Sequence, residues 1–453
     1  MKPLTVIVIG ATGDLFRKKL SAVFFDLYSK NIFPEKFTFI GLSRKMFSHG
    51  EFRDYTKKAI GLGFDEELLE NFLKNFYYYS VDATDKDALE SLREILDNND
   101  KTFGQCSNKL LYIATVPNLY ESIFENIRES GLGVACAAPF GEEKAWVRIV
   151  VEKPFGTDGT NARKLDQILS ESFQEDQIFR IDHYLAKETL QNVFAFRFRN
   201  SMFEPLWSKK YIEKIEISAL ETKDISGREN FYDKTGAIRD FGQNHLLEML
   251  SLVAMEEPEE FTGSGVQKSR GRLLQSVFFD LKEESDLVVG QYEGYGKSLD
   301  GSKTETYFKA KLSVESTRWE GVPFYIEHGK ALSDSKSEIV VTFRPSENGK
   351  RNKVVFRIAP NPEICASMSL KNISLGGDKE EVQEMCFPLL SDESKSIYPY
   401  EKLVLDVLSG DQTLFVSSEE VKEEWRITSE IQGALPKVKL RIYKEGESPE
   451  QII

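Results

Sequence analysis

Near its amino terminus the chain reads Thr5-Val6-Ile7-Val8-Ile9-Gly10-Ala11-Thr12-Gly13-Asp14-Leu15, an apolar run followed by a glycine turn and the start of a helical segment. Gly10 and Gly13 let the backbone approach a pyrophosphate, which the amide groups at the start of the helix bind. The G-x-x-G spacing is weaker evidence than the full G-x-G-x-x-G pattern, and an ordinary tight turn is the alternative. Because the motif joins the first strand to the first helix, we predict a Rossmann-like dinucleotide-binding fold.

The first 180 residues continue this alternation of short apolar runs with longer segments of helical periodicity. Such alternation is typical of βαβ units, whose parallel sheet is buried on both faces. We therefore predict an α/β dinucleotide-binding domain over residues 1–180. Its predicted strands are Leu4–Ile9, Phe37–Ile40, Phe76–Val81, Leu110–Ala114 and Val147–Val151.

After residue 210 the pattern changes to strand-like alternation, with helical stretches at Ile238–Met255 and Gln267–Leu281. This pattern favours one large, mainly antiparallel sheet. We therefore predict a second, α+β domain over residues 181–453. Its predicted strands are Ile212–Ala219, Leu287–Tyr292, Tyr307–Val314, Glu338–Phe343 and Lys353–Ile358.

The composition of the 453 residues limits the possible partners. The formal net charge is −14, so the chain as a whole repels nucleic acids and anionic membrane surfaces. No apolar stretch approaches the roughly 20 residues of a membrane-spanning helix, and a buried strand explains the apolar amino terminus better than a signal peptide. Cys106, Cys136, Cys365 and Cys386 form no C-x-x-C pair, so we expect reduced thiols in a cytoplasmic protein without a thiolate metal site.

The end of the second predicted strand indicates which dinucleotide the chain binds. Proteins that bind NAD usually place an acidic residue there for the ribose hydroxyls, whereas NADP requires a cation for its extra phosphate. The run Phe39-Ile40-Gly41-Leu42-Ser43-Arg44-Lys45 offers Arg44 and Lys45 and no acid. We therefore predict NADP as the cofactor, with solvated surface cations as the alternative.

A second informative segment is Arg180-Ile181-Asp182-His183-Tyr184-Leu185-Ala186-Lys187-Glu188. It places a carboxylate, an imidazole, a phenol and an ammonium within six positions. A site that binds an anionic, hydroxyl-rich substrate and moves a proton uses all four groups. Histidine is scarce in this chain, which has four, and a solvated turn that opens a helix is the alternative for this segment.

Two further segments carry candidate catalytic residues. Val150-Val151-Glu152-Lys153-Pro154-Phe155-Gly156 places Lys153 just after a predicted strand, at the edge where open α/β sheets bind ligands. Arg239-Asp240-Phe241-Gly242-Gln243-Asn244-His245 leads into the apolar helix of residues 246–255. A histidine on such a helix is more often a core residue than a catalyst, and an aspartate that orients it favours catalysis.

Four motifs in this order, GATGDL, EKPFG, RIDHYL-x-KE and RD-x-x-QNH, make the chain similar to the glucose-6-phosphate dehydrogenase family. The resemblance extends from about Val6 to beyond Pro360. RIDHYL-x-KE is the most specific of the four, whereas EKP also occurs in other sugar dehydrogenases.

The resemblance implies an oxidoreductase that transfers hydride from the anomeric carbon of D-glucose 6-phosphate to NADP. The products are 6-phospho-D-glucono-1,5-lactone and NADPH, the first oxidative step of the pentose phosphate pathway. It implies that His245 is the general base and that Asp182 orients it, with no metal ion. It also implies a homodimer or homotetramer formed through the second domain. Substrate would be bound by Lys153, His183, Tyr184, Lys187, Glu221, Asp240 and Lys330, and NADP by Gly10, Ala11, Thr12, Gly13, Asp14, Leu15, Lys19, Arg44 and Lys153.

Some positions depart from the family pattern, namely Ala186, Ser335 and Ala359, and the loop of residues 131–145 is long. Two other functions remain open at this stage. Another sugar dehydrogenase with an EKP motif would explain Lys153 but not the phosphate-binding set. A noncatalytic NADP-binding sensor would be expected to lack the base, whereas Asp182 and His245 are both present.

Overall fold

The computed structural model describes residues 2–61, 63–134, 136, 145–295, 299, 301–345, 350–372, 379–389 and 399–452. The chain divides into two units. Unit 1 consists of Met1–His183, Thr262–Ser264 and Ile397–Val421, and unit 2 consists of Tyr184–Phe261, Gly265–Ser396 and Lys422–Ile453. Each unit is built around one sheet, which we call sheet A in unit 1 and sheet B in unit 2.

Sheet A has the strand order β16-β6-β5-β4-β1-β2-β3, in which β1 to β6 run parallel. The order starts in the middle at β1, extends to β3 on one side and resumes at β4 on the other, as in doubly wound dinucleotide-binding folds. The predicted parallel sheet is therefore confirmed. The strands are β1 (Leu4–Ile9), β2 (Phe37–Ser43), β3 (Phe76–Ser80), β4 (Asn108–Ile113), β5 (Val147–Val151), β6 (Ile178–Ile181) and β16 (Phe415–Val416).

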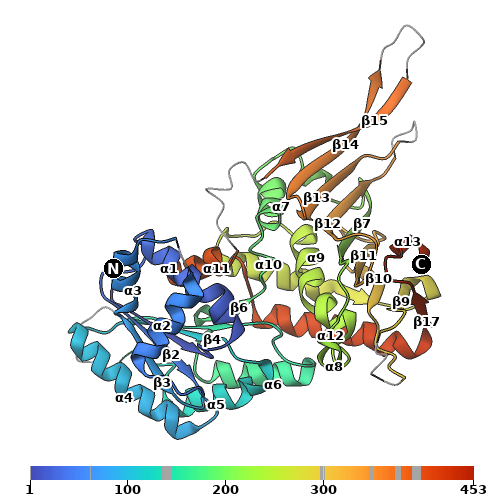
Figure 1. Cartoon of the computed structure of the whole chain (residues 1–453). Coiled ribbons are helices and arrows are strands. Elements are labelled where there is room, and N and C mark those ends of the chain that lie inside the picture. Colours follow the sequence, from blue (N-terminus) through green and yellow to red (C-terminus); the bar gives the residue numbers. More distant parts are fainter. Residues whose placement is uncertain are drawn as a thin grey trace. The chain divides into compact units, whose positions relative to one another are not determined.

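Helices cover both faces of sheet A, which explains why every residue of β1 is buried (Figure 1). Each helix presents one apolar face to the sheet, as α4 does with Leu89, Leu92 and Leu96 at helical spacing. One layer contains the π-helical η1 (Phe16–Leu20), α1 (Ser21–Ser29), α2 (His49–Ile60), α3 (Glu66–Leu73) and α11 (Pro399–Ser409). The other layer contains α4 (Lys86–Phe103), α5 (Tyr120–Ser130) and α6 (Gly159–Ser170).

A segment from the carboxyl-terminal part of the chain completes unit 1, and this differs from the predicted division into residues 1–180 and 181–453. β16 pairs antiparallel with β6, and the ring of Phe415 packs edge-on against Phe179. The amide of Gln412 donates hydrogen bonds to the carbonyl groups of Glu175 and Ile178. Local patterns along the sequence do not reveal such a return, because each of these contacts joins residues more than two hundred positions apart.

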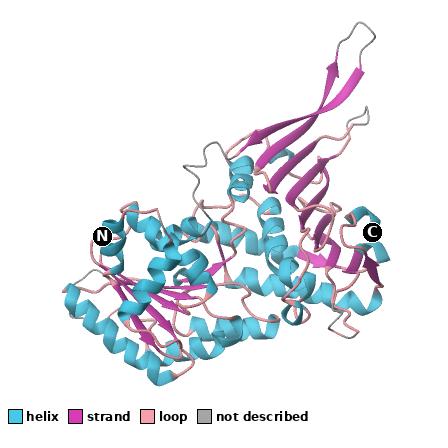
Figure 2. Cartoon of the chain, viewed as in Figure 1, coloured by secondary structure: helices cyan, strands magenta, loops and turns pink. Residues whose placement is uncertain are grey.

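Sheet B has the strand order β15-β14-β13-β12-β7-β11-β10-β9-β17. Its neighbouring strands run antiparallel except for the pairs β7–β11 and β9–β17, which confirms a mainly antiparallel sheet. Figure 2 shows its outer strands, β14 and β15, extending past the helices that pack on the other strands. The strands are β7 (Ile212–Leu220), β9 (Leu287–Tyr292), β10 (Tyr307–Val314), β11 (Phe324–Gly329), β12 (Lys336–Phe343), β13 (Lys353–Ala359), β14 (Glu363–Asn372), β15 (Lys379–Pro388) and β17 (Leu440–Tyr443).

The main core of unit 2 lies between sheet B and helices α7 (Glu188–Phe198), α9 (Leu247–Ala254), α10 (Gly263–Ser276) and α12 (Ser418–Ala434). The predicted helix at residues 238–255 is present as η5 (Ile238–Leu246) followed by α9. The predicted helix at residues 267–281 is wrong at its end, because β8 (Val277–Phe279) pairs with β10. The apolar residues of β8 fit a strand as well as a helix, and pairing with β10 decides between them.

Side chains from other segments bind the last carbonyl groups of α9. The guanidinium of Arg197 and the indole of Trp207 donate to the carbonyl of Val253, at 3.0 and 2.8 Å. The indole of Trp319 donates to the carbonyl of Ala254 at 2.7 Å. These bonds satisfy carbonyl groups that a helix end leaves without intrahelical partners, and they fix the helix that continues η5.

The remaining helices are short, and in the described part of the chain no helix is both long and apolar enough to cross a membrane. They are η2 (Pro117–Leu119), η3 (Glu175–Gln177), η4 (Glu204–Leu206), α8 (Glu229–Tyr232), η6 (Glu284–Asp286), η8 (Leu435–Lys437) and α13 (Pro449–Ile452).

The expectation of reduced thiols is wrong in this structure, because the cysteines form the disulfides Cys106–Cys136 and Cys365–Cys386. Cys365 and Cys386 lie directly opposite each other on β14 and β15. The sheet register therefore brings together residues whose wide spacing in the sequence gave no sign of a pair. Most of the long loop at residues 131–145 lies outside the described residues.

Candidate active site

The glycine turn after β1 brings two segments of backbone into close contact. Gly10 has a φ of +97°, and a Cβ atom there would lie 2.5 Å from the carbonyl oxygen of Ala114, at the end of β4. The Gly13 amide donates to the carbonyl of Gly10 at 2.9 Å. Only glycine therefore fits at position 10, where the ends of β1 and β4 meet.

A cavity of about 280 Å³ lies at the carboxyl ends of the central strands of sheet A. This is the edge at which doubly wound sheets bind dinucleotides. Four of the predicted cofactor residues line it, namely Gly10, Thr12, Gly13 and Arg44. It is also lined by Ser43, Asp82, Thr84, Ala114 and Thr115, among others.

The structure does not bring the other five predicted cofactor residues, Ala11, Asp14, Leu15, Lys19 and Lys153, to the wall of this cavity. Ala11 is fully buried. Asp14 is exposed, and its ion pairs with Arg17 and Lys18, at 2.9 and 2.7 Å, hold its pKa below the usual value.

The turn that carries Arg44 is fixed by a tyrosine of the next strand. The hydroxyl of Tyr78 lies 3.1 Å from the carbonyl oxygen of Ser43 and 2.6 Å from that of Lys45, so it donates to this turn. The Lys45 ammonium lies 4.5 Å from the ring centroid of Phe47. Arg44 borders the cavity, and Lys45 is not among the residues that line it.

Asp82 adds a carboxylate to this cavity. The amide and hydroxyl of Thr84 donate to it at 3.0 and 2.7 Å. These two bonds and the nearby charge of Arg44 hold the pKa of Asp82 below its usual value. Asp82 and Thr84 were not predicted from the sequence, although their place just after the third strand was a usable signal.

Lys19 and Lys153 are both near a buried carboxyl group, that of Glu152. The hydroxyl of Tyr112 donates to Glu152 at 2.6 Å, and that of Tyr400 lies 3.3 Å from its other oxygen. Burial raises the pKa of Glu152, while these two bonds and the charges of Lys19 and Lys153 oppose that rise. Sequence reasoning missed this cluster because its tyrosines come from separate segments.

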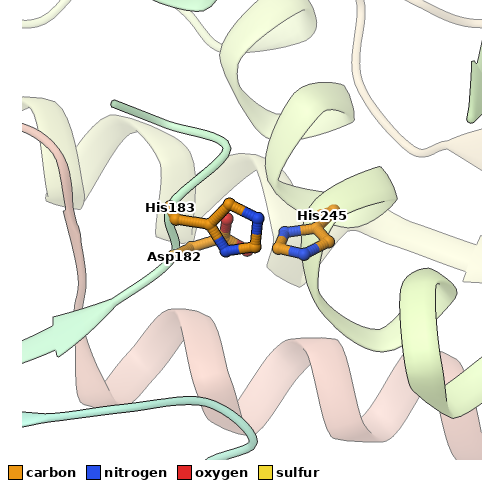
Figure 3. A group of neighbouring side chains, drawn as sticks. All are labelled: Asp182, His183 and His245. Atoms are coloured by element: carbon orange, nitrogen blue, oxygen red, sulfur yellow. The ribbon is translucent and has the colours of Figure 1, made fainter. Parts of the chain in front are cut away.

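The predicted catalytic pair lies in a group of three titratable side chains. Asp182, His183 and His245 each offer a ligand atom within 4.8 Å of the other two. Figure 3 shows Asp182 and His183 on the segment that follows β6, beside the His245 ring on η5. Asp182 is 2% exposed and His245 is fully buried.

Two of the predicted phosphate-binding residues contact each other, and one of them, Tyr184, also contacts His245. The ring of Tyr184 stacks on the His245 imidazole at 4.1 Å, and the Lys187 ammonium lies 3.5 Å from the centroid of the Tyr184 ring. The structure therefore gathers the phenol, the ammonium and the candidate base in one place.

The other predicted substrate residues of unit 2 form a charged cluster. The Lys330 ammonium pairs with the carboxylates of Glu221 and Asp240, and it lies 3.3 Å from the latter. The Lys330 side chain is 12% exposed, whereas those of Glu221 and Asp240 are about one third exposed. Two carboxylates held by one cation at the surface are suited to accept hydroxyl groups of a polar ligand.

Asp182, His183 and His245 are also a donor set that a divalent metal ion uses, since carboxylate and imidazole are common metal ligands. An ion bound there would engage the lone pair with which an imidazole accepts a proton. Metal binding and general base catalysis by His245 therefore exclude each other.

Two family models together match almost the whole chain. The model for the glucose-6-phosphate dehydrogenase NAD binding domain matches residues 7–192, and that for the glucose-6-phosphate dehydrogenase C-terminal domain matches residues 194–452.

Named relatives and solved structures agree with these models. The chain is 35% identical to glucose-6-phosphate 1-dehydrogenase of Borreliella burgdorferi, over 99% of this chain and 95% of the relative. It is 32% identical to that of Bacillus subtilis, over 95% and 91%. A structure of glucose-6-phosphate dehydrogenase in complex with glucose-6-phosphate has a TM-score of 0.88 at 27% identity, covering 98% of this chain and 95% of the other. The Mycobacterium avium glucose-6-phosphate 1-dehydrogenase has a TM-score of 0.82 at 29% identity, covering 100% and 96%.

Proposed function

The chain belongs to the glucose-6-phosphate dehydrogenase family, and we propose that His245 is its general base and that Asp182 orients this imidazole. The protein is an oxidoreductase that converts glucose 6-phosphate into 6-phospho-D-glucono-1,5-lactone with a nicotinamide dinucleotide. The observation that carries the residue assignment is the approach of the Asp182, His183 and His245 side chains to within 4.8 Å of one another.

The reaction removes a hydride from the anomeric carbon and a proton from the hydroxyl group on that carbon. The dinucleotide, when bound at the cavity of sheet A, supplies the hydride acceptor. His245 takes the proton of the anomeric hydroxyl, and the electron pair of that O–H bond becomes the second bond of the lactone carbonyl. The negative charge of Asp182 stabilises the imidazolium that forms. Positioned proton transfer of this kind contributes about 10²–10⁴-fold to the rate.

The substrate is selected by its phosphate and its hydroxyl groups. Lys187, His183 and Tyr184 form charge-assisted hydrogen bonds with the phosphate, which free glucose lacks. Glu221 and Asp240 accept hydrogen bonds from the sugar hydroxyls, and Lys330 offsets the repulsion between these two carboxylates. This assignment is supported by the ion pairs of Lys330 and by the contact of Lys187 with Tyr184. Lys153 is proposed to act near both the substrate and the cofactor.

The proposed cofactor is NADP. Arg44 borders the cavity at the end of β2, and Ser43 precedes it where NAD-binding folds place an acid. A guanidinium at this place binds the extra phosphate of NADP with two parallel hydrogen bonds. Gly10, Thr12 and Gly13 would hold the pyrophosphate at the glycine turn.

We propose that the protein forms a homodimer or homotetramer through β14 and β15. Phe387 and Met385 lie opposite Ile364 and Ala366, so the four apolar side chains share one face of this strand pair. Phe387 is 65% exposed and Met385 is 44% exposed. Both lie on β15, an edge strand of sheet B, and exposed apolar edge strands tend to associate with another chain. Phe387→Glu should lower the sedimenting mass, and Val382→Glu, on the opposite face, is the control. A monomeric parent protein would contradict the proposal.

The proposed location is the cytoplasm, because the charged phosphates of the substrate and NADP keep both from crossing a membrane. The disulfides bear on this proposal, since such bonds are uncommon in reducing compartments. Alkylation of the protein in intact cells, with and without prior reduction, measures how many of its four cysteines are oxidised there. Complete oxidation in the cell would count against a cytoplasmic location.

The first experiment is to follow NADPH formation by the purified protein with glucose 6-phosphate, with free glucose as the control and NAD in place of NADP. We expect rapid reduction only with the phosphorylated sugar and with a preference for NADP. Equal rates with free glucose would contradict the phosphate-binding set. A chelator should leave the rate unchanged, and loss of activity that a divalent ion restores would contradict a metal-free base.

A further inference from the structure

Four aromatic rings of unit 2 contact one another around the candidate base. The His328 ring stacks flat on the Phe241 ring, with centroids 4.0 Å apart and planes at 8°. Phe241 in turn packs against His245 at 5.0 Å and 69°, and edge-on against Tyr184 at 5.6 Å and 86°. We call His328, Phe241, Tyr184 and His245 the ring cluster.

His328 has one tautomer in this position. It lies on β11, fully buried, and its Nδ1 atom is 2.5 Å from the carbonyl oxygen of Ala219 on β7. A carbonyl only accepts, so Nδ1 carries the proton and Nε2 does not. Within the described residues, Nε2 is buried and has no hydrogen-bond partner.

Its surroundings also keep His328 neutral. Burial, and then the charge of Lys330, lower the pKa of His328 to about 4, and Glu221 and Asp240 only partly oppose this. A protonated ring would place a second cation near Lys330 and a second N–H where no acceptor is available in the described chain. His328 is therefore a flat, uncharged surface against Phe241.

The backbone beneath these rings has little freedom to move. A Cβ atom on Gly242, the residue after Phe241, would lie 2.8 Å from the Phe308 ring of β10. The helix η5 is thus in close contact with sheet B at this point. With the backbone held, the direction of the His245 ring depends on the side chains around it, and Phe241 packs against one side of it.

We propose that His328 is a positioning residue for the reaction: its ring fixes the plane of Phe241, and Phe241 fixes the plane of His245. The inference rests on the proposed role of His245 as the base. The competing explanation is that His328 only stabilises the pairing of β11 with β7, through its hydrogen bond to the carbonyl of Ala219.

The test is a double-mutant cycle on kcat with His328→Asn, Phe241→Leu and the double variant. Asparagine keeps a donor close to the place of Nδ1 for the Ala219 carbonyl but removes the ring. We expect each single change to lower kcat by roughly 10- to 100-fold with little change in either KM, because a small displacement of a catalytic group slows chemistry and not binding. The double variant should be no slower than Phe241→Leu alone.

Several outcomes would overturn the inference. If His328→Asn has the kcat of the parent protein, the role of His328 is limited to its hydrogen bond between β11 and β7. If the kcat of the double variant falls by the product of the two single losses, His328 does not act through Phe241. Phe279→Leu is the matched control, since Phe279 and Phe241 are both 8% exposed and both belong to the core of unit 2, and Phe279 lies on β8. It should lower the melting temperature to a similar degree without the loss in kcat.

His245→Ala in the same series separates this inference from the proposed function. An active His245→Ala variant would remove the base assignment itself. An inactive one, together with independent losses at His328 and Phe241, would remove only the positioning role.

Discussion

The ring of Tyr184 stacks on the imidazole of His245, with centroids 4.1 Å apart and planes at 28°. Tyr184 also carries the Lys187 ammonium over its ring, at 3.5 Å from the centroid. One of the residues proposed to bind the phosphate, Tyr184, is therefore in direct contact with the residue proposed to take the proton.

His245→Ala should lower kcat by about 10²–10⁴-fold and leave the KM for glucose 6-phosphate nearly unchanged. The imidazole accepts a proton only as the reaction proceeds, so its loss affects the transition state more than substrate binding. Steady-state kinetics with NADP measures both parameters. Phe279→Leu serves as the control for a change in the same unit. A KM that rises as much as kcat falls would contradict a role confined to catalysis.

Arg44→Ala should weaken the binding of NADP strongly and the binding of NAD only slightly. The guanidinium borders the cavity at the end of β2, where the extra phosphate of NADP is expected. A hydrogen bond to a charged group contributes about 1.5–3 kcal/mol, which corresponds to a loss of roughly 10- to 100-fold in affinity. Fluorescence titration of both dinucleotides measures it. Lys45→Ala is the matched control, since its ammonium contacts Phe47. Equal losses for the two dinucleotides would contradict the assignment.

Tyr78→Phe should reduce the preference for NADP although Tyr78 is not one of the residues that line the cavity. Its hydroxyl donates to the turn that carries Arg44, and phenylalanine keeps the ring in the core. The loss of a buried hydrogen bond of about 1 kcal/mol predicts a roughly fivefold rise in the KM for NADP, with kcat unchanged. The same variant measured with NAD is the internal control. A parallel rise in both values of KM would mean that Tyr78 supports the whole cavity and not the turn.

Much of the fold follows from local patterns in the sequence. The predicted strands at residues 4–9, 147–151, 287–292 and 307–314 coincide with β1, β5, β9 and β10. Each is a buried or regularly alternating run whose side chains alone specify a strand. The pairing of β16 with β6, the disulfides and the end of α10 were not predicted, because each depends on a partner far away in the sequence.

The sequence also indicated several residues that the structure brings close together at the candidate site. Asp182, His183, Tyr184 and Lys187 are neighbours in the chain. The structure places the first three of these residues beside His245. Glu221, Asp240 and Lys330 also come together. His328 lies in none of the motifs, and the EKPFG motif indicated Lys153 and not Glu152 as a site residue. The importance of His328 and Glu152 arises from burial and from rings and hydroxyls of other segments, which the sequence does not show.

Glu152→Gln should make the protein more stable at neutral pH than the parent chain, and the difference should shrink on acidification. Burial raises the pKa of Glu152 above its value in the unfolded chain, despite the hydrogen bonds of Tyr112 and Tyr400. The folded state therefore holds this proton more tightly than the unfolded state. Its stabilising effect is full below the unfolded pKa and is lost as the pH rises through the folded pKa.

Thermal unfolding of both proteins between acidic and neutral pH measures this difference. Glutamine keeps the size of the side chain and its carbonyl still accepts from a tyrosine hydroxyl, so the comparison isolates the charge. Asp14→Asn is the control. Asp14 is exposed and its pKa is lowered, so the pH dependence of the stability difference should have the opposite sign. If Glu152→Gln instead destabilises the protein most at neutral pH, the ionised carboxylate is held by Lys19 and Lys153 more strongly than burial opposes it.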